Sequence, residues 1–172
     1  MKVRASDTPH VEVIKALGGA PVPMPISELY PALERKVVDA ACQPWSSVIQ
    51  FRANEYCKYY VDIPFSPLSQ ALVMNLDSWK RLSAKDQKIV EEATGKRFAE
   101  AAGKANDRVA VLGRKTTQDA GLEIWVPSTA ELARWHTRMR PLQEKWIADM
   151  EAKKLPGKKL FDEASELAKK YR

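Results

Sequence analysis

The sequence predicts an α/β fold, in which a short, mainly parallel β-sheet is flanked by helices and followed by long C-terminal helices. Two observations indicate this class. Residues 2–42 alternate short apolar segments with helical segments, which is the order that a parallel sheet requires. Residues 83–120 then carry apolar residues near the helical period over a length that strands do not reach.

The N-terminal elements follow one another closely. We expect strands over 2–5, 20–24 and 37–42, a helix over 8–17 that ends at Gly18-Gly19, and a helix over 28–36. Ser27 is a residue type that caps helix N-termini, and Tyr30 and Leu33 follow it at helical spacing. Parallel strands have their carboxyl ends at one edge of a sheet. Arg4 and Gln43, which close the first and third strands, are therefore expected at the edge where open α/β sheets bind ligands.

The middle of the chain is predicted to be mostly extended. Pro44 can open a short helix, because proline is tolerated in the first turn. Residues 56–63 and 69–75 are then expected to be extended, with Pro64-Phe65-Ser66-Pro67 breaking the chain between them.

Residues 83–120 are predicted to form one long helix. Ser83 with Asp86 matches a variant of the capping box at its start. Without a break this helix spans roughly 55 Å at about 1.5 Å per residue, which exceeds one small lobe. Gly103 and Gly113 are the positions at which we expect it to bend.

The C-terminal part is predicted to hold a short strand over 122–126 and two helices. Ser128 caps the first, which contains Pro141 and is expected to kink there. Pro156-Gly157 breaks the chain before a last amphipathic helix over 160–171.

Composition excludes several classes of protein. The net charge of +6 is spread along the chain without a recognised nucleic-acid motif, so we expect a solvated surface and no nucleic-acid partner. No apolar run reaches the length of a membrane span, and the N-terminus lacks the apolar core of a secretion signal. His10 and His136 lack paired ligands, and no catalytic motif is present. We therefore expect no metal, no cofactor and no enzyme activity.

The two cysteines, Cys42 and Cys57, are too few for a disulfide framework. Cys42 is expected to be a small buried apolar residue beside Gln43. A disulfide with Cys57 and a reactive thiol are the alternatives.

Several sequence blocks occur in the order found in one receptor family. They are Val3-Arg4, Ala16-Leu17-Gly18, Pro23-Met24-Pro25, Ser27-Glu28-Leu29-Tyr30, Ala32-Leu33, Val37-Val38-Asp39, Leu72-Val73-Met74-Asn75, Trp79, Leu82 and Asp86-Gln87. On these blocks nearly the whole chain resembles the solute receptors of tripartite ATP-independent periplasmic (TRAP) transporters, of the dicarboxylate-receptor (DctP) type. No single block is specific, but their ordered run is.

The resemblance implies a fold and a site. Such receptors are two-lobed and close on an organic acid that they deliver to membrane transporter subunits in the periplasm. The match begins at the second lobe, so the first lobe is expected to be largely missing, as in an excised fragment or a natural half-receptor. Arg4 matches the family arginine that pairs with the ligand carboxylate. Ile26 matches a position whose side chain packs on the ligand, and Gln43 matches a position whose side chain hydrogen-bonds the ligand. Trp45 resembles a tryptophan of some members.

The resemblance also implies four parts of the chain. They are a ligand-lobe α/β core over 1–63, a hinge or crossover strand and short helix over 64–82, a long helix over 83–120, and a C-terminal strand and helices over 121–172 that pack on the lobe. Tyr59, Tyr60 and Phe65 are then expected to pack at the hinge, or alternatively to line the cleft.

Four positions depart from the family pattern. Ile26 replaces a usual phenylalanine and Gln43 a frequent asparagine, which leaves the acid unidentified. Lys36 and Ala40 replace glycines. Because glycine takes positive φ without strain after a helix, Lys36 indicates either a shifted turn or a relaxed constraint on the pocket.

Two functions follow as expectations. The first is a partial solute receptor that binds a small carboxylate through Arg4, weakly as an isolated chain. The alternative is a homodimeric assembly or interaction protein, in which surface left uncovered by the first lobe forms the interface.

Overall fold

The computed structural model describes residues 1–63 and 71–170. The chain divides into two compact units. The first comprises Met1–Leu29, Arg35–Cys42 and Pro127–Arg172, and the second Tyr30–Glu34 and Gln43–Val126. The sequence-based division into a lobe core, a hinge, a long helix and a C-terminal part remains a prediction.

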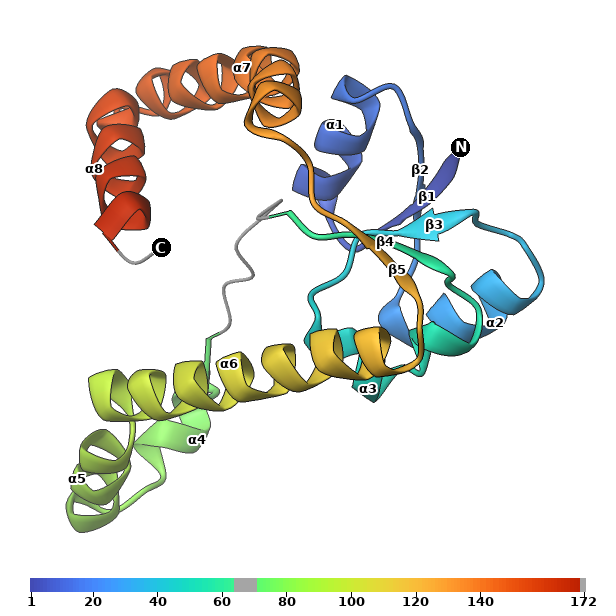
Figure 1. Cartoon of the computed structure of the whole chain (residues 1–172). Coiled ribbons are helices and arrows are strands. Elements are labelled where there is room, and N and C mark those ends of the chain that lie inside the picture. Colours follow the sequence, from blue (N-terminus) through green and yellow to red (C-terminus); the bar gives the residue numbers. More distant parts are fainter. Residues whose placement is uncertain (64–70, 171–172) are drawn as a thin grey trace. The chain divides into compact units, whose positions relative to one another are not determined.

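The first unit is built on a three-stranded parallel sheet (Figure 1). Its strands are β1 (Lys2–Ala5), β2 (Ala20–Pro23) and β3 (Ala40–Ala41), in the order β2-β1-β3. Arg4 pairs with Val22 on one side and with Ala41 on the other. The predicted α/β class with a short parallel sheet is therefore confirmed. The third strand is shorter than the expected 37–42.

Helix α1 (Thr8–Ala16) connects the first two strands. Asp7 caps it, because its Oδ1 accepts a hydrogen bond of 2.9 Å from the backbone N–H of His10. Ile14 of this helix packs with Val3 and Ala5 of β1 in a small buried cluster. The helix thus covers the strand that carries Arg4.

The segment after β2 differs from the expected helix over 28–36. It forms a 3-10 turn, η1 (Ile26–Glu28), followed by the short α2 (Leu29–Glu34). The predicted Ser27 cap is wrong: Ser27 lies inside η1, and Pro25 occupies the N-cap position without a side-chain hydrogen bond. Lys36 has a φ of 56°, so the turn keeps the left-handed conformation that glycine favours and has not shifted.

The second unit contains a two-stranded parallel sheet of β4 (Tyr59–Val61) and β5 (Glu123–Trp125). Two short helical elements precede it, α3 (Ser46–Gln50) and η2 (Ala53–Glu55). The proline-containing segment 64–67, with Phe65, lies outside the described residues. Residues 71–75 form no strand, contrary to expectation, and lead into α4 (Leu76–Lys80), which Asn75 caps.

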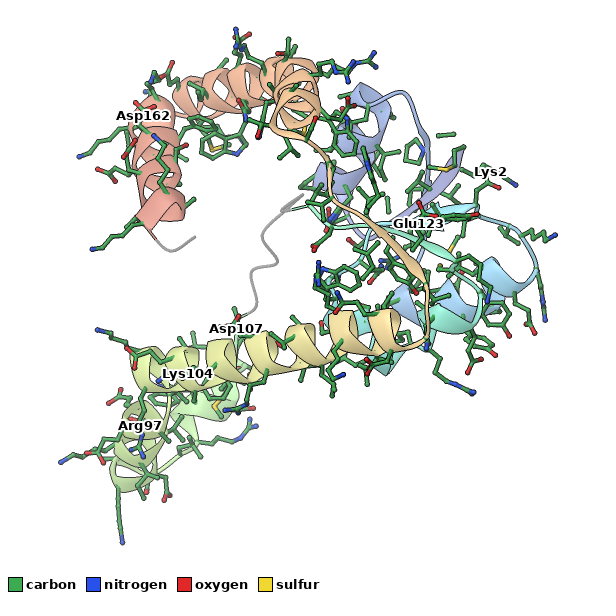
Figure 2. The ribbon with its side chains drawn as sticks, viewed as in Figure 1. Lys2, Arg97, Lys104, Asp107, Glu123 and Asp162 are labelled. Atoms are coloured by element: carbon green, nitrogen blue, oxygen red, sulfur yellow. The ribbon has the colours of Figure 1, made fainter. Side chains whose placement is uncertain are left out.

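The predicted single helix over 83–120 is wrong, because two helices occupy this segment. They are α5 (Ala84–Ala93) and α6 (Gly95–Asp119). The break lies at Thr94, which is extended, and at Gly95, which has a φ of 63°. Gly103 and Gly113 lie within the unbroken α6. Figure 2 shows side chains around the N-terminal half of α6, where Lys104 and Asp107 are exposed.

Helices α7 (Thr129–Ala152) and α8 (Gly157–Lys170) complete the first unit (Figure 1). The predicted Ser128 cap is confirmed by a hydrogen bond of 3.2 Å from the backbone N–H of Glu131. A Cβ at Gly157 would lie 2.5 Å from the Ile147 carbonyl oxygen, so a glycine lets α8 start against α7. Within the described residues, no helix has the length and apolarity needed to span a membrane.

Candidate functional site

The guanidinium of Arg4 lies over the carboxyl-terminal edge of the first sheet. Arg4 is in the central strand β1, and its Nε and Nη2 donate hydrogen bonds of 3.1 and 2.9 Å to the carbonyl oxygen of Met24. Met24 directly follows the end of β2. Only 3% of Arg4 is exposed, so the strand delivers a buried cation to the edge that the sequence predicted.

Part of the donor capacity of this guanidinium is unused within the described residues. The bonds to Met24 use the Nε hydrogen and one Nη2 hydrogen, and arginine carries five such donors. The remaining hydrogens, on Nη1 and Nη2, donate to none of the described residues. They form the planar fork that matches two carboxylate oxygens.

The charge of Arg4 is not neutralised by an ion pair within residues 1–63 and 71–170. Burial lowers the pKa of Arg4, while the charges of Asp7 and Cys42 act in the opposite direction. A buried cation without a paired anion is costly, because water no longer solvates it.

Asp7 is the acidic group that acts on Arg4, but its oxygens have other partners. Oδ1 accepts from the His10 backbone and lies 2.8 Å from His10 Nδ1, and Oδ2 accepts from Ser6 Oγ at 2.9 Å. The hydrogen bond from the His10 backbone is the main reason that the pKa of Asp7 is lowered. Asp7 therefore acts as the N-cap of α1.

Two further residues of the first unit were singled out in the sequence. Ile26 opens η1, two residues after the Met24 carbonyl that holds Arg4, and is half-buried. The N–H of Cys42 donates to the carbonyl oxygen of Arg4 at 3.3 Å. Both Cys42 and Cys57 are free thiols, so the disulfide alternative is wrong. Burial raises the pKa of Cys42 to about 11, which makes a reactive thiolate unfavourable at neutral pH.

Gln43 and Trp45 belong to the second unit, so the structure places the four predicted residues in two groups. The amide oxygen of Gln43 accepts a hydrogen bond of 3.0 Å from Ser47 Oγ. Its amide nitrogen, Nε2, is buried and has no partner among the described residues. Gln43 thus presents a fixed, unused donor.

Trp45 is held by a network that sequence reasoning missed. Its indole N–H donates to Asp62 Oδ1 at 2.8 Å, and Asp62 Oδ2 accepts from Arg114 Nε at 2.8 Å. These residues come from the segment before α3, the end of β4, and α6. The one sequence signal is that Asp62 is the only charged residue in the otherwise uncharged segment 59–63.

Tyr60 completes this group. Its ring stacks on Trp45, with ring centroids 5.5 Å apart and an angle of 19° between the planes. Its hydroxyl is buried, and the side chain of Thr117 is its polar neighbour. Burial raises the pKa of Tyr60 to about 12, so the hydroxyl stays protonated near neutral pH.

Comparison with known proteins gives a consistent result. Residues 1–149 match DctP, the bacterial extracellular solute-binding protein family 7. The C4-dicarboxylate-binding periplasmic protein DctP of Rhodobacter capsulatus is 30% identical over 148 residues, which cover 84% of this chain and 43% of that protein.

Two solved structures extend the likeness. A TRAP solute-binding protein from a marine metagenome, specific for aromatic acid ligands and bound to metahydroxyphenylacetate, is 28% identical with a TM-score of 0.83, and the match covers 99% of this chain and 55% of that one. A Bradyrhizobium sp. TRAP periplasmic solute-binding protein in complex with galacturonate is 30% identical with a TM-score of 0.79, covering 94% and 53%. The chain thus spans about half the length of these proteins.

Proposed function

Because the chain belongs to the bacterial extracellular solute-binding protein family 7, we propose that it binds a small organic acid through Arg4, as part of a TRAP-type receptor. The observation that carries this proposal is the buried guanidinium without an ion-pair partner. Its open fork suits the two oxygens of a carboxylate.

The ligands of similar proteins support the same chemistry. The three proteins compared above bind C4-dicarboxylates, metahydroxyphenylacetate and galacturonate. These acids differ in size and in their other groups, and the carboxylate is what they share. An arginine in a fixed position is therefore the most economical explanation for recognition of the whole set.

The other predicted residues then have distinct roles. Ile26 supplies apolar contact, Gln43 Nε2 supplies a hydrogen-bond donor, and the stacked Trp45 supplies a flat wall. We expect weak binding by these 172 residues alone, because a ligand covered by one lobe only stays exposed to water, where a salt bridge contributes only ~0–1 kcal/mol.

Titration followed by protein NMR tests the assignment of Arg4. We expect succinate, 3-hydroxyphenylacetate and galacturonate to give saturable shifts of the Arg4 and Met24 amides, with dissociation constants in the millimolar range. Arg4→Lys keeps the charge but loses the planar fork, so the saturable shifts should disappear.

Arg35→Lys is the matched control, because Arg35 is exposed and should leave binding unchanged. Thermal melts of both variants establish that they are folded. Binding by Arg4→Lys at the affinity of the unchanged protein would refute the role of Arg4. Micromolar affinity from a proven monomer would refute the expectation of weak binding.

The role of the protein in transport is proposed only from its membership of this family. The receptor would work in the periplasm and deliver the acid to membrane transporter subunits. It would act by binding and not by catalysis, as expected of a solute-binding family.

A second candidate function is self-assembly, which a surface observation favours. The second unit exposes large apolar side chains, namely Leu72, Val73, Met74, Leu76, Ile89, Phe98, Val111 and Leu112. Exposed apolar side chains that gather into a patch often mark an interface. We propose a homodimer that covers part of it. Light scattering should then give a dimer that Val111→Lys shifts toward monomer, whereas a monomer at high concentration would contradict this function.

A further inference from the structure

We propose that Pro25 is a positioning residue for the ligand carboxylate, because it fixes the Met24 carbonyl that orients the Arg4 guanidinium. This inference rests on the proposed function and deepens it. It also states how the acid is held: the carboxylate is bound end-on, by Nη1 and Nη2 of Arg4, and not side-on, by Nε and Nη2. All the residues concerned belong to the first unit.

The first step concerns the edge of the guanidinium that the protein itself uses. The planar group has two edges that suit a carboxylate, one formed by the hydrogens on Nε and Nη2 and the other by those on Nη1 and Nη2. The carbonyl oxygen of Met24 accepts from Arg4 Nε at 3.1 Å and from Nη2 at 2.9 Å. One backbone oxygen thus occupies the side-on edge, so a carboxylate has to bind at the end-on edge.

The second step is that Met24 lies just beyond the ladder that fixes β2. The parallel pairing of β2 with β1 ends at the pair Pro23 and Ala5. The N–H of Met24 donates to the Ala5 carbonyl at 3.3 Å, so the sheet still holds the start of this residue. Its carbonyl lies past the ladder and bonds to the Arg4 side chain instead. The direction of that carbonyl depends on the ψ angle of Met24, which the sheet does not set.

The third step is the restriction that a proline imposes on the residue before it. The ring of Pro25 disfavours a helical conformation of Met24 and favours an extended one. A change of ψ from extended to helical values would turn the Met24 carbonyl by about 180° and break both bonds to Arg4. The restriction matters here because the 3-10 turn η1 begins at the next residue, and the Glu28 N–H donates to the Pro25 carbonyl at 3.2 Å. Without the ring, Met24 could join that turn.

The fourth step is that the chain offers a matched control for Pro25. Pro25 is exposed, so its replacement removes little packing and acts mainly through Met24. Pro23 is also exposed and also flanks Met24, but its ring restricts Val22, which the ladder already holds by its pairing with Arg4. Either proline limits the freedom of the unfolded chain, so Pro25→Ala and Pro23→Ala should lower the melting temperature by similar amounts.

Hydrogen exchange of the Arg4 side chain tests the positioning without a ligand. In the unchanged protein the Arg4 Nε–H should exchange slowly with water, because it is buried and bonded to Met24. Arg4→Lys identifies its NMR signal by removing it. Pro25→Ala should accelerate the exchange about tenfold by local opening, and Pro23→Ala should not. Rapid exchange in the unchanged protein, or equal exchange in the two alanine variants, would overturn the inference.

NMR titration with succinate and 3-hydroxyphenylacetate tests the effect on binding. Pro25→Ala should weaken binding about threefold to fivefold, because a smaller fraction of the molecules then presents an oriented guanidinium, whereas Pro23→Ala should leave it unchanged. In the unchanged protein either acid should shift the Nη resonances of Arg4 more than its Nε resonance. Loss of Nε–H protection on binding would mean that the acid displaces the Met24 carbonyl and binds side-on, which contradicts the inference.

The failure of this inference and the failure of the proposed function give different results. If neither acid binds the unchanged chain, the proposed function fails, and the positioning of a carboxylate by Pro25 fails with it. If binding depends on Arg4 but is equally strong in Pro25→Ala and Pro23→Ala, this inference alone is refuted.

Discussion

A Cβ atom added at Gly113 would overlap the carbonyl oxygen of Trp45. Helix α6 therefore passes the start of α3 at a distance that only a glycine permits. The same helix carries Arg114, which holds Asp62 and through it the indole of Trp45. The close approach and the hydrogen-bond network both fix Trp45 against α6.

Substitution of Gly113 by alanine should destabilise the protein. The methyl group must displace backbone, which we expect to cost about 1–3 kcal/mol of the free energy of unfolding, as for other overpacked sites. Urea unfolding monitored by tryptophan fluorescence measures this change.

Gly103→Ala is the control within the same helix. No atom lies within 4 Å of a Cβ at Gly103, so alanine should stabilise the helix by about 0.5–1 kcal/mol. Equal effects of the two substitutions would show that the packing around Gly113 is not as tight as described.

Lys36→Gly should stabilise the protein by up to about 1 kcal/mol, because a left-handed residue other than glycine is strained. Lys36 has a φ of 56° and is exposed, so the substitution removes little packing. Arg35→Gly, one position earlier and also exposed, should not stabilise. Thermal melts of both variants measure these changes in stability. A lower melting temperature for Lys36→Gly would argue against strain at this turn.

Local signals in the sequence predicted much of the fold. The helix caps at Ser83 and Ser128 form as expected, because a cap depends on residues three positions apart. Strand β1 and its parallel partners follow from the alternation of elements. Arg4 could be placed at the sheet edge for the same reason.

The failures arose where local signals conflict or where contacts are distant. Thr94-Gly95 breaks the predicted long helix, although the apolar spacing continues on both sides of the break. Pro25 redirects the chain, so Ser27 enters a 3-10 turn instead of capping α2. The Asp62–Arg114 pair joins residues 52 positions apart, which no periodic pattern reveals. The stacking of Tyr60 on Trp45 likewise joins residues too far apart in sequence for a local pattern to reveal it.

Asp62→Ala should destabilise the second unit and free the Trp45 side chain. It removes the acceptor of two hydrogen bonds at once, from Trp45 Nε1 and Arg114 Nε. We expect a loss of about 2 kcal/mol, since a half-buried donor left unpaired costs about 1–3 kcal/mol. Unfolding by urea gives the energy, and loss of the Trp45 indole N–H shift in NMR reports the local change.

Asp62→Asn separates charge from hydrogen bonding. Its oxygen can still accept one bond, so we expect less than half of the alanine effect. Lys115, whose partner is the exposed Asp119, offers a control: Asp119→Ala should change stability by less than about 0.5 kcal/mol. If Asp62→Ala matches Asp119→Ala, the network does not support Trp45.

Stability should fall in alkaline solution, in part because of Cys42. Burial raises the pKa of this thiol from its ordinary 9.0 to about 11. The folded state thus favours the protonated thiol. The stabilising contribution is complete below pH 9, and it is lost as the pH rises toward 11, where the unfolded chain has already released the proton.

Urea midpoints measured across this pH range should therefore decline, and Cys42→Ala should decline less steeply than the unchanged chain. Cys57, whose pKa is also raised by burial, provides the same comparison in the second unit. In parallel, Cys42 should react slowly with a thiol reagent at neutral pH in the folded protein and rapidly after unfolding in urea. Fast reaction in the folded state, with a pH dependence of stability unchanged by Cys42→Ala, would mean that the thiol beside Arg4 is solvated rather than buried.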